Sequence, residues 1–165
     1  MQTTFTLRQF KPNDLEHVMN INRICLPENY SPYFFMDLYE RFPQTFIVAE
    51  QELEIVGYIM CRIETGMTSF GLFGISRKGH VVSIAVLPKH QRKGVGAALM
   101  ENAMKNMPQY KAKEIYLEVR TSNTPAVNMY KKLGLQIIRR NRRYYADGED
   151  AYLMAKRLVE KKTGS

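Results

Sequence analysis

The sequence predicts an α/β protein built on one central mixed β-sheet that is flanked by helices. Two observations carry this prediction: short segments rich in Val, Ile and Phe have the length of strands, and segments with a helical spacing of apolar residues lie between them. With 165 residues and 45% apolar content, the chain suits one globular domain. We expect a single domain over residues 1–158 and a polar, disordered tail over 159–165.

The N-terminal part is predicted to form a strand over 5–10, where apolar and polar residues alternate, and then two helices. Asp14 is expected to accept hydrogen bonds from the free amides of the first helix. Ser31 and Pro32 are typical of the cap and first turn of the second helix, which stops near Pro43. The buried face of the first helix is predicted to include four apolar residues: Leu15, Val18, Met19 and Ile24.

The middle of the chain is predicted to be rich in strands. The segments 45–49 and 55–62 indicate a hairpin. The glycine-rich segment 66–79 predicts a mobile connection, whose apolar residues either pack over a groove or belong to a plain surface loop. Segment 80–87 is nearly continuous apolar sequence and predicts a central strand. The remaining expected elements are a long helix that opens near Val95, a strand over 114–120, a helix over 125–133 capped by Asn123 or Thr124, and two late strands over 136–139 and 151–158.

Composition excludes several classes of protein. The formal net charge of +8 favours RNA, an acidic membrane face or a small polyanion as partner, or simply a solvated basic surface. No RNA-binding motif supports nucleic-acid recognition, and no segment approaches the roughly 20 apolar residues of a membrane span. Cys25 and Cys61 form no C-x-x-C pair and the histidines lack metal-ligand spacing, so we expect buried free thiols and no metal. Without a signal peptide, the cytoplasm is the expected location.

The most specific segment joins the apolar strand 81–87 to a glycine turn at Gln91–Gly96, which opens a helix. The first amides of a helix have no internal partner, and the helix dipole favours negative charge there. Gly94 and Gly96 allow close approach of a phosphate, and Arg92 with Lys93 adds positive charge. The segment therefore predicts a pyrophosphate site, although an ordinary glycine turn has the same pattern. It matches neither the Walker P-loop nor the Rossmann fingerprint.

The pattern Gln91-x-x-Gly94-x-Gly96 resembles the acetyl-CoA signature of the GCN5-related N-acetyltransferases (GNAT). A second match follows in the family's order, Asn123-x-x-Ala126-x-x-x-Tyr130-x-x-x-Gly134, and only Leu135 departs from the family's usual aromatic residue. The resemblance implies the GNAT fold and acetyl-CoA as cosubstrate. It implies cofactor contacts from Ile84, Ala85, Val86, Gln91, Arg92, Lys93, Gly94, Val95, Gly96, Ala97, Asn123 and Tyr130.

A narrower resemblance concerns the acceptor. The segments 26–30 and 144–152 are similar to those of the catalytic subunits of NatA-type protein N-terminal acetyltransferases, and most similar to the archaeal members that resemble ribosomal-protein alanine acetyltransferases. This implies direct attack by the α-amine of a protein N-terminus beginning with Ser, Ala or Met, in a ternary complex. It also raises the expectation of ribosome association. The alternatives are acetylation of lysine side chains or of a small amine, and a CoA- or ribosome-binding protein without activity.

The chemistry requires a neutral amine and a proton for the leaving thiolate. A protein α-amine, with a pKa of about 8, needs only modest deprotonation compared with lysine at about 10.4. The resemblance places Glu28 at the acceptor amine and lets His80 and Glu118 hold a water that takes its proton. Tyr130 is then the general acid, and the Val86 amide holds the thioester oxygen. The residues expected to line the acceptor cleft are Leu26, Tyr30, Arg120, Tyr144 and Tyr145.

Each of these residues also has an interpretation without a catalytic role. Glu28 fits a solvated loop carboxylate, and His80 fits a strand-end histidine bonded to backbone. Glu118 fits an ion pair with Arg120 or a nearby lysine, and Tyr130 fits a core tyrosine on an amphipathic helix.

Overall fold

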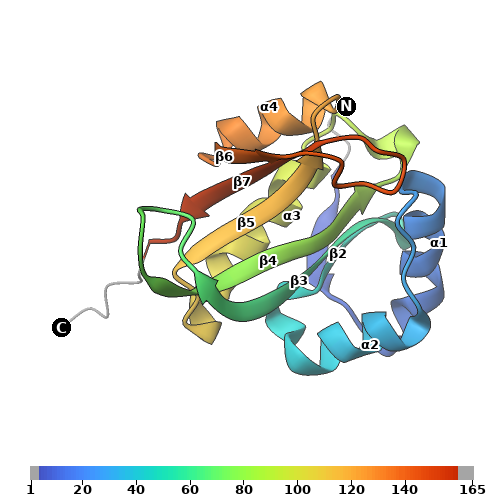
Figure 1. The fold of residues 1–165 in the computed structure, drawn as a ribbon. Coiled ribbons are helices and arrows are strands. Elements are labelled where there is room, and N and C mark those ends of the chain that lie inside the picture. The colour runs from blue at the N-terminus through green and yellow to red at the C-terminus, as the bar shows by residue number, and fades with distance from the viewer. Residues whose placement is uncertain (1–3, 160–165) are drawn as a thin grey trace. The chain divides into compact units, whose positions relative to one another are not determined.

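The computed structural model of the chain describes residues 4–159 and has the predicted mixed α/β architecture. The seven strands hydrogen-bond in the order β1-β2-β3-β4-β5-β7-β6 (Figure 1). The elements are β1 (Thr6–Gln9), α1 (Leu15–Cys25), α2 (Pro32–Arg41), β2 (Ile47–Gln51), β3 (Glu54–Met67), β4 (Ile75–Val86), α3 (Val95–Asn106), β5 (Glu114–Arg120), α4 (Thr124–Lys132), β6 (Gln136–Asn141) and β7 (Ala151–Arg157).

The chain divides into two compact units, each of which has its own internal contacts. The first comprises the described residues up to 62 together with 81–107, and the second comprises 63–80 together with the described residues from 108 onward. Strands β3 and β4 therefore contribute residues to both units. The expectation of one domain over 1–158 stays a prediction, and residues 160–165 of the expected tail lie outside the described residues.

In the first unit, β2 pairs antiparallel with both β1 and β3, as the predicted hairpin requires. The core beside this sheet is aromatic: the rings of Phe10 and Phe46, both fully buried, stack with centroids 4.0 Å apart. Helix α2 buries Phe35 and Leu38 on one face, and it begins as predicted, with the Ser31 hydroxyl accepting from the Phe34 amide at 3.2 Å. Helix α3 packs against β2.

Two predictions about α1 are wrong. Ile24 is 55% exposed, whereas Ile21 is buried, because at 100° per residue Ile24 lies about 120° around the helix from Val18. Asp14 does not cap α1. Its carboxylate instead accepts two hydrogen bonds from Arg8, at 2.8 and 3.0 Å, and one from the amide of Lys11 at 2.8 Å.

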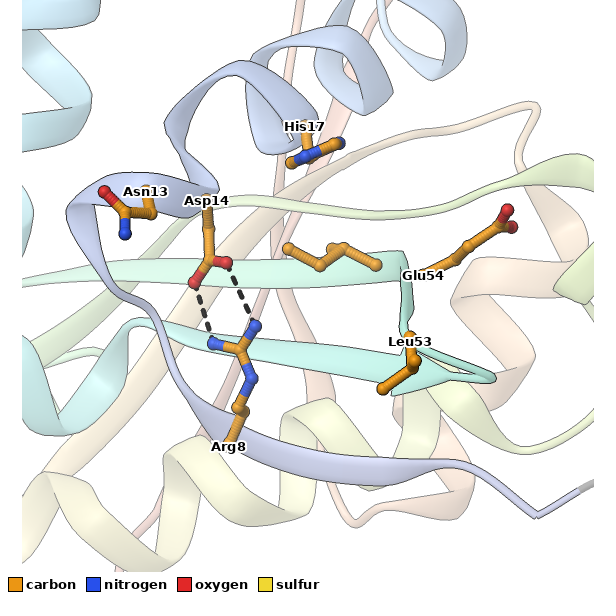
Figure 2. A pocket seen from close by; sticks show the side chains of 7 residues that line it. Arg8, Asn13, Asp14, His17, Leu53 and Glu54 are labelled. Atoms are coloured by element: carbon orange, nitrogen blue, oxygen red, sulfur yellow. Dashed lines mark hydrogen bonds and ion pairs between the residues drawn. The ribbon is translucent and has the colours of Figure 1, made fainter.

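The pair Arg8–Asp14 lines a small pocket of about 300 Å³ beside the β2–β3 turn (Figure 2). Burial alone would raise the pKa of Asp14, but the bonds from Arg8 and from the Lys11 amide together lower it. Arg8 also donates to Glu50 at 2.8 Å, so its guanidinium joins β1 to β2 and to the start of α1. Because both ends are hydrogen-bonded, we assign this partly buried cluster a structural role.

In the second unit, the N-terminal part of β4 pairs parallel with β5, and β5 and β6 each pair antiparallel with β7. Side chains of β5 alternate, so Ile115, Leu117 and Val119 are buried on one face. Helix α4 buries Val127 and Tyr130.

Half of the expected mobile connection at 66–79 is strand, which corrects the prediction. β3 extends to Met67 and β4 begins at Ile75, so only 68–74 form the turn. The amide of Thr68 donates to the carbonyl of Gly74 at 3.0 Å, and the amide of Ser69 donates to the Glu114 carboxylate at 2.8 Å. These bonds hold the turn because they satisfy backbone groups that a coil would leave to water. Among the apolar residues of segment 66–79, Leu72, Phe73 and Ile75 are exposed, as on a plain surface loop.

Buried phenols and a buried thiol predict a loss of stability in alkali. Burial raises the pKa of Tyr58 and of Tyr130 to about 12, and burial also raises the pKa of the Cys61 thiol. The unfolded chain loses the thiol proton near pH 9 and the phenol protons near pH 10, whereas the folded chain keeps them. Stability is therefore full below about pH 9 and falls toward pH 12. Each tyrosine then removes about 1.4 kcal/mol per pH unit from the free energy of unfolding.

Urea unfolding at pH 8 to 11 measures this slope. Tyr58→Phe should flatten it, since one buried phenol is gone, while Tyr33→Phe at an 80% exposed position should not. A free energy of unfolding that stays constant up to pH 11 would contradict the prediction.

Candidate functional site

The N-terminus of α3 leaves backbone donors without partners inside the helix. The Ala98 amide donates to the carbonyl of Gly94, four residues earlier, at 3.0 Å. In helix geometry the preceding amides, those of Val95, Gly96 and Ala97, have no intrahelical acceptor. Gly94 has φ of +85°, and Arg92 with φ of +61° is left-handed too, so the turn folds tightly before the helix. The amides and the helix dipole together make an anion site.

The surroundings of this turn fit the pyrophosphate of acetyl-CoA. Residues 91–94 are exposed, and a Cβ added at Gly94 would meet no atom within 4 Å. Arg92 and Lys93 carry positive charge beside the same open space. The donor set is therefore amides and cations around an accessible volume, which suits a polyanion.

The C-terminal end of β4 leads into this turn. The amide of Leu87 donates to the Val56 carbonyl of β3 at 2.8 Å. Successive residues of a strand direct their N–H and C=O groups to opposite edges, so those of Val86 face the edge away from β3. At that edge, the Gln91 side chain donates to the Val86 carbonyl at 2.9 Å and the Cys25 thiol approaches it at 3.5 Å. Gln91 thus ties the turn to the strand. Cys25 is only partly buried, although the sequence predicted a buried thiol.

The other predicted cofactor residues of β4 alternate along the strand. Ala85 is buried, whereas Ile84 and Val86 lie on the half-buried face.

The segment 26–30 of the first unit is held by a residue that sequence reasoning missed. Asn22 is 1% exposed, and its side-chain amide donates to the Glu28 carbonyl at 3.0 Å. Leu26 ends α1 in extended conformation, and the Tyr30 ring stacks on Phe34 at 4.8 Å. An Asn at a buried helical position was the signal available in the sequence, because a buried amide needs a partner.

In the second unit, His80 and Glu118 form a pair. The imidazole Nε2 lies 2.7 Å from the Glu118 carboxylate, and the two side chains are 13% and 15% exposed. His80 was expected at the start of its strand. It lies instead in the middle of β4, where it is the register partner of Tyr116 of β5. Glu118 follows two residues later on the same face. The interpretation of Glu118 as a partner of Arg120 is therefore wrong.

Arg120 instead organises the segment between β6 and β7. Its guanidinium lies 2.8 Å from Asp147 and 3.0 Å from Glu149, and it lies over the Tyr145 ring at 4.0 Å. The Tyr144 ring meets Tyr145 edge-on at 5.0 Å. Residues 145–149 form a turn, since the Gly148 amide donates to the Tyr145 carbonyl at 2.9 Å. The predicted acceptor residues 120, 144 and 145 therefore lie together.

The second cofactor motif lies on α4. The Asn123 side chain caps this helix by accepting from the Ala126 amide at 3.3 Å. Tyr130 is 5% exposed, and burial raises its pKa to about 12. Its phenol therefore keeps its proton throughout the neutral range.

A further residue near His80 was missed from sequence. The ring of Tyr116 is parallel to the imidazole of His80, with centroids 4.4 Å apart and an interplanar angle of 1°. Its i−2 spacing from Glu118 on a strand was the available signal, because alternate residues share a face.

Within residues 4–159, no group of three or more His, Cys, Asp and Glu side chains is arranged to hold a metal ion. None of the described helices has the length and hydropathy to span a membrane.

Comparison with known proteins identifies relatives over nearly the whole chain. Residues 15–135 match the Acetyltransferase (GNAT) family. An N-alpha-acetyltransferase of Sulfurisphaera tokodaii is 50% identical over 153 residues, which cover 92% of each chain. The crystal structure of Ard1 from Thermoplasma volcanium gives a TM-score of 0.81 at 30% identity, covering 94% of this chain and 99% of that one. A NatB acetyltransferase complex bound to CoA and MES gives 0.79 at 25% identity, over 93% and 99% of the two chains.

The anion site predicts the effect of a charge at Gly94. Gly94→Glu places a carboxylate beside the free amides of α3 and strains a left-handed position, so we expect the affinity for acetyl-CoA to fall at least about 100-fold. Gly94→Asn is the matched control, since Asn tolerates left-handed backbone and adds no charge. Calorimetry measures both affinities, and thermal unfolding checks the fold. Unchanged affinity in Gly94→Glu would rule out the site.

Proposed function

The chain belongs to the GNAT family of acetyltransferases, and from that premise we propose that it transfers the acetyl group of acetyl-CoA to the α-amine of a protein N-terminus. The observation that carries the proposal is the 50% identity, over 92% of both chains, to an N-alpha-acetyltransferase. The paired His80 and Glu118 support it, because the reaction needs a proton acceptor.

Acetyl-CoA supplies the acetyl group as an activated thioester. Residues 91–97 would hold its pyrophosphate through the amides of α3 and the charges of Arg92 and Lys93. The Val86 amide, at the edge of β4 away from β3, is the candidate donor to the acetyl carbonyl. Gln91 and Asn123, whose side chains secure the turn and cap α4, would act by shaping these segments.

The acceptor amine must lose a proton to react. Its ordinary pKa of about 8 leaves a fraction neutral at pH 7, so a weak base suffices. His80 and Glu118 share one hydrogen bond at 2.7 Å and would take the proton together, through an ordered water. Glu28, whose backbone is held by Asn22, is assigned the place beside the incoming amine.

Tyr130 is the candidate proton donor to the leaving sulfur. A general acid must hold its proton at working pH, and the pKa of about 12 ensures this.

Acceptor selection is assigned to the two ordered segments. Leu26 and Tyr30 follow α1, and Tyr144 and Tyr145 precede β7, where Arg120 holds the turn. Rigid aromatic side chains favour an extended chain end over a lysine in mid-chain. The proposed acceptors are chain ends whose first residue is small, such as Ser or Ala, and also those that begin with Met. The protein is assigned to the cytoplasm, and its net charge of +8 is compatible with ribosome association.

A peptide panel tests the acceptor class and the role of Glu28. The peptides differ only in residue one, and each carries one internal lysine and either a free or a blocked α-amine. We expect acetylation of free peptides beginning with Ser, Ala or Met. Glu28→Gln keeps the shape and removes the charge, so it should lower the rate by about 10-fold or more, and most for small first residues.

Equal rates on blocked and free peptides would make the enzyme a lysine acetyltransferase. If only free peptides react but Glu28→Gln keeps the wild-type profile, the acceptor class stands and Glu28 has no part in selection. Glu16→Gln, at an exposed position of α1, is the control for a lost carboxylate.

Tyr130→Phe tests the proton donor. The substitution removes one hydroxyl and little volume, so we expect kcat to drop about 10²- to 10⁴-fold with little change in acetyl-CoA affinity. Steady-state rates and calorimetry measure the two quantities. A variant with the wild-type rate would leave Tyr130 as a core residue only.

A further inference from the structure

We propose that Tyr116 is a positioning residue that holds the imidazole of His80 toward Glu118. The inference rests on the proposed function, in which His80 and Glu118 receive the proton of the acceptor amine. Neither the family motifs nor the sequence pattern assigned a role to Tyr116.

The stack between the two rings is close and nearly parallel. The centroids of His80 and Tyr116 are 4.4 Å apart and the ring planes differ by 1°. The two residues are register partners in the parallel ladder of β4 and β5, so the backbone hydrogen bonds bring them side by side. Rotation of the imidazole about its terminal torsion would drive its edge into the Tyr116 ring.

Tyr116 is itself restrained by polar groups. Its hydroxyl donates to the carboxylate of Glu64 on β3. The ammonium of Lys78 lies over its ring, 4.4 Å from the centroid, and donates to the carbonyl of Met67 at 2.9 Å. Lys78 is 9% exposed, so this contact is shielded from solvent and stronger than a surface cation–π contact.

Two restraints therefore act on His80. The hydrogen bond to Glu118 fixes the direction of Nε2 at 2.7 Å, and the stack fixes the plane of the ring. The terminal torsion of histidine has broad minima, so a hydrogen bond alone leaves the ring free to tilt. A displacement of the base by about 1 Å costs up to about 100-fold in rate. Loss of the stack is therefore expected to slow the reaction.

Charged groups contact both rings. They include the Glu118 carboxylate at the imidazole, and the Glu64 carboxylate and the Lys78 ammonium at Tyr116.

Proton NMR of the imidazole tests the geometry without any assay of activity. The chain has three histidines, so the signals of His80 are assigned by their absence in His80→Gln. In the wild-type protein the stack should shift the ring protons of His80 upfield. This shift should vanish in Tyr116→Leu and persist in Tyr116→Phe. A shift retained in Tyr116→Leu would overturn the stacking.

Kinetics test the positioning. Tyr116→Leu should lower kcat by about 10- to 100-fold with little change in KM for acetyl-CoA, and Tyr116→Phe should recover the rate to within about tenfold of wild type. In a His80→Gln background, Tyr116→Leu should cause no further loss, because it acts only through His80. Additive losses in the double variant would overturn the proposal.

Two further variants guard against a general loss of folding. Tyr110→Leu removes another half-buried tyrosine of the same unit and should leave kcat unchanged. If Tyr116→Leu unfolds, Tyr116→Val replaces it, because a β-branched side chain suits a strand and still removes the ring, and it should abolish the upfield shift and lower kcat. An unchanged shift and rate in Tyr116→Val would then overturn the proposal. If the NMR shifts follow the prediction but no peptide N-terminus is acetylated, the proposed function fails while the stacked geometry remains.

Discussion

The short parallel ladder between β4 and β5 is the constraint on which the candidate chemistry depends. It pairs Lys78 with Glu114 and His80 with Tyr116, so two strands that are far apart in sequence place their polar residues on one face. Because alternate residues of a strand share a face, Glu118 follows Tyr116 and reaches His80. A shift of one residue in this register would turn His80 or Glu118 to the opposite face. The backbone hydrogen bonds of the ladder thus bring together the two residues proposed as the proton acceptor.

The segments assigned to the acceptor are held by buried or charged side chains and not by regular secondary structure. Asn22 secures the backbone of Glu28 with one hydrogen bond, and Arg120 secures the turn before β7 with two carboxylates and the Tyr145 ring. The anion site of α3 differs in kind, because its donors are backbone amides that helix geometry leaves unpaired. The proposed recognition of the cosubstrate therefore relies on backbone amides, while the proposed selection of the acceptor relies on side chains that hold loops.

Most elements of the fold could be predicted because they depend on local patterns. The bounds of β5 and the caps of α2 and α4 follow from apolar alternation and from Ser31 and Asn123. Two misses were decided by partners in other elements. Asp14 pairs with Arg8, six residues earlier, and does not cap α1, whereas half of the glycine-rich segment 66–79 is strand, with Glu114, far along the chain, holding its turn. No local pattern indicates a partner that lies far along the chain.

By itself, the sequence determined the fold class, the glycine turn before α3 and the candidate residues, because glycine conformation, helix caps and strand alternation are set by near neighbours. Only the tertiary structure decided which candidates meet. It joined Glu118 to His80 and Arg120 to Asp147 and Glu149, and it placed Tyr116 against the imidazole. Each of these contacts crosses between separate elements, so it exists only once strand register and packing are set.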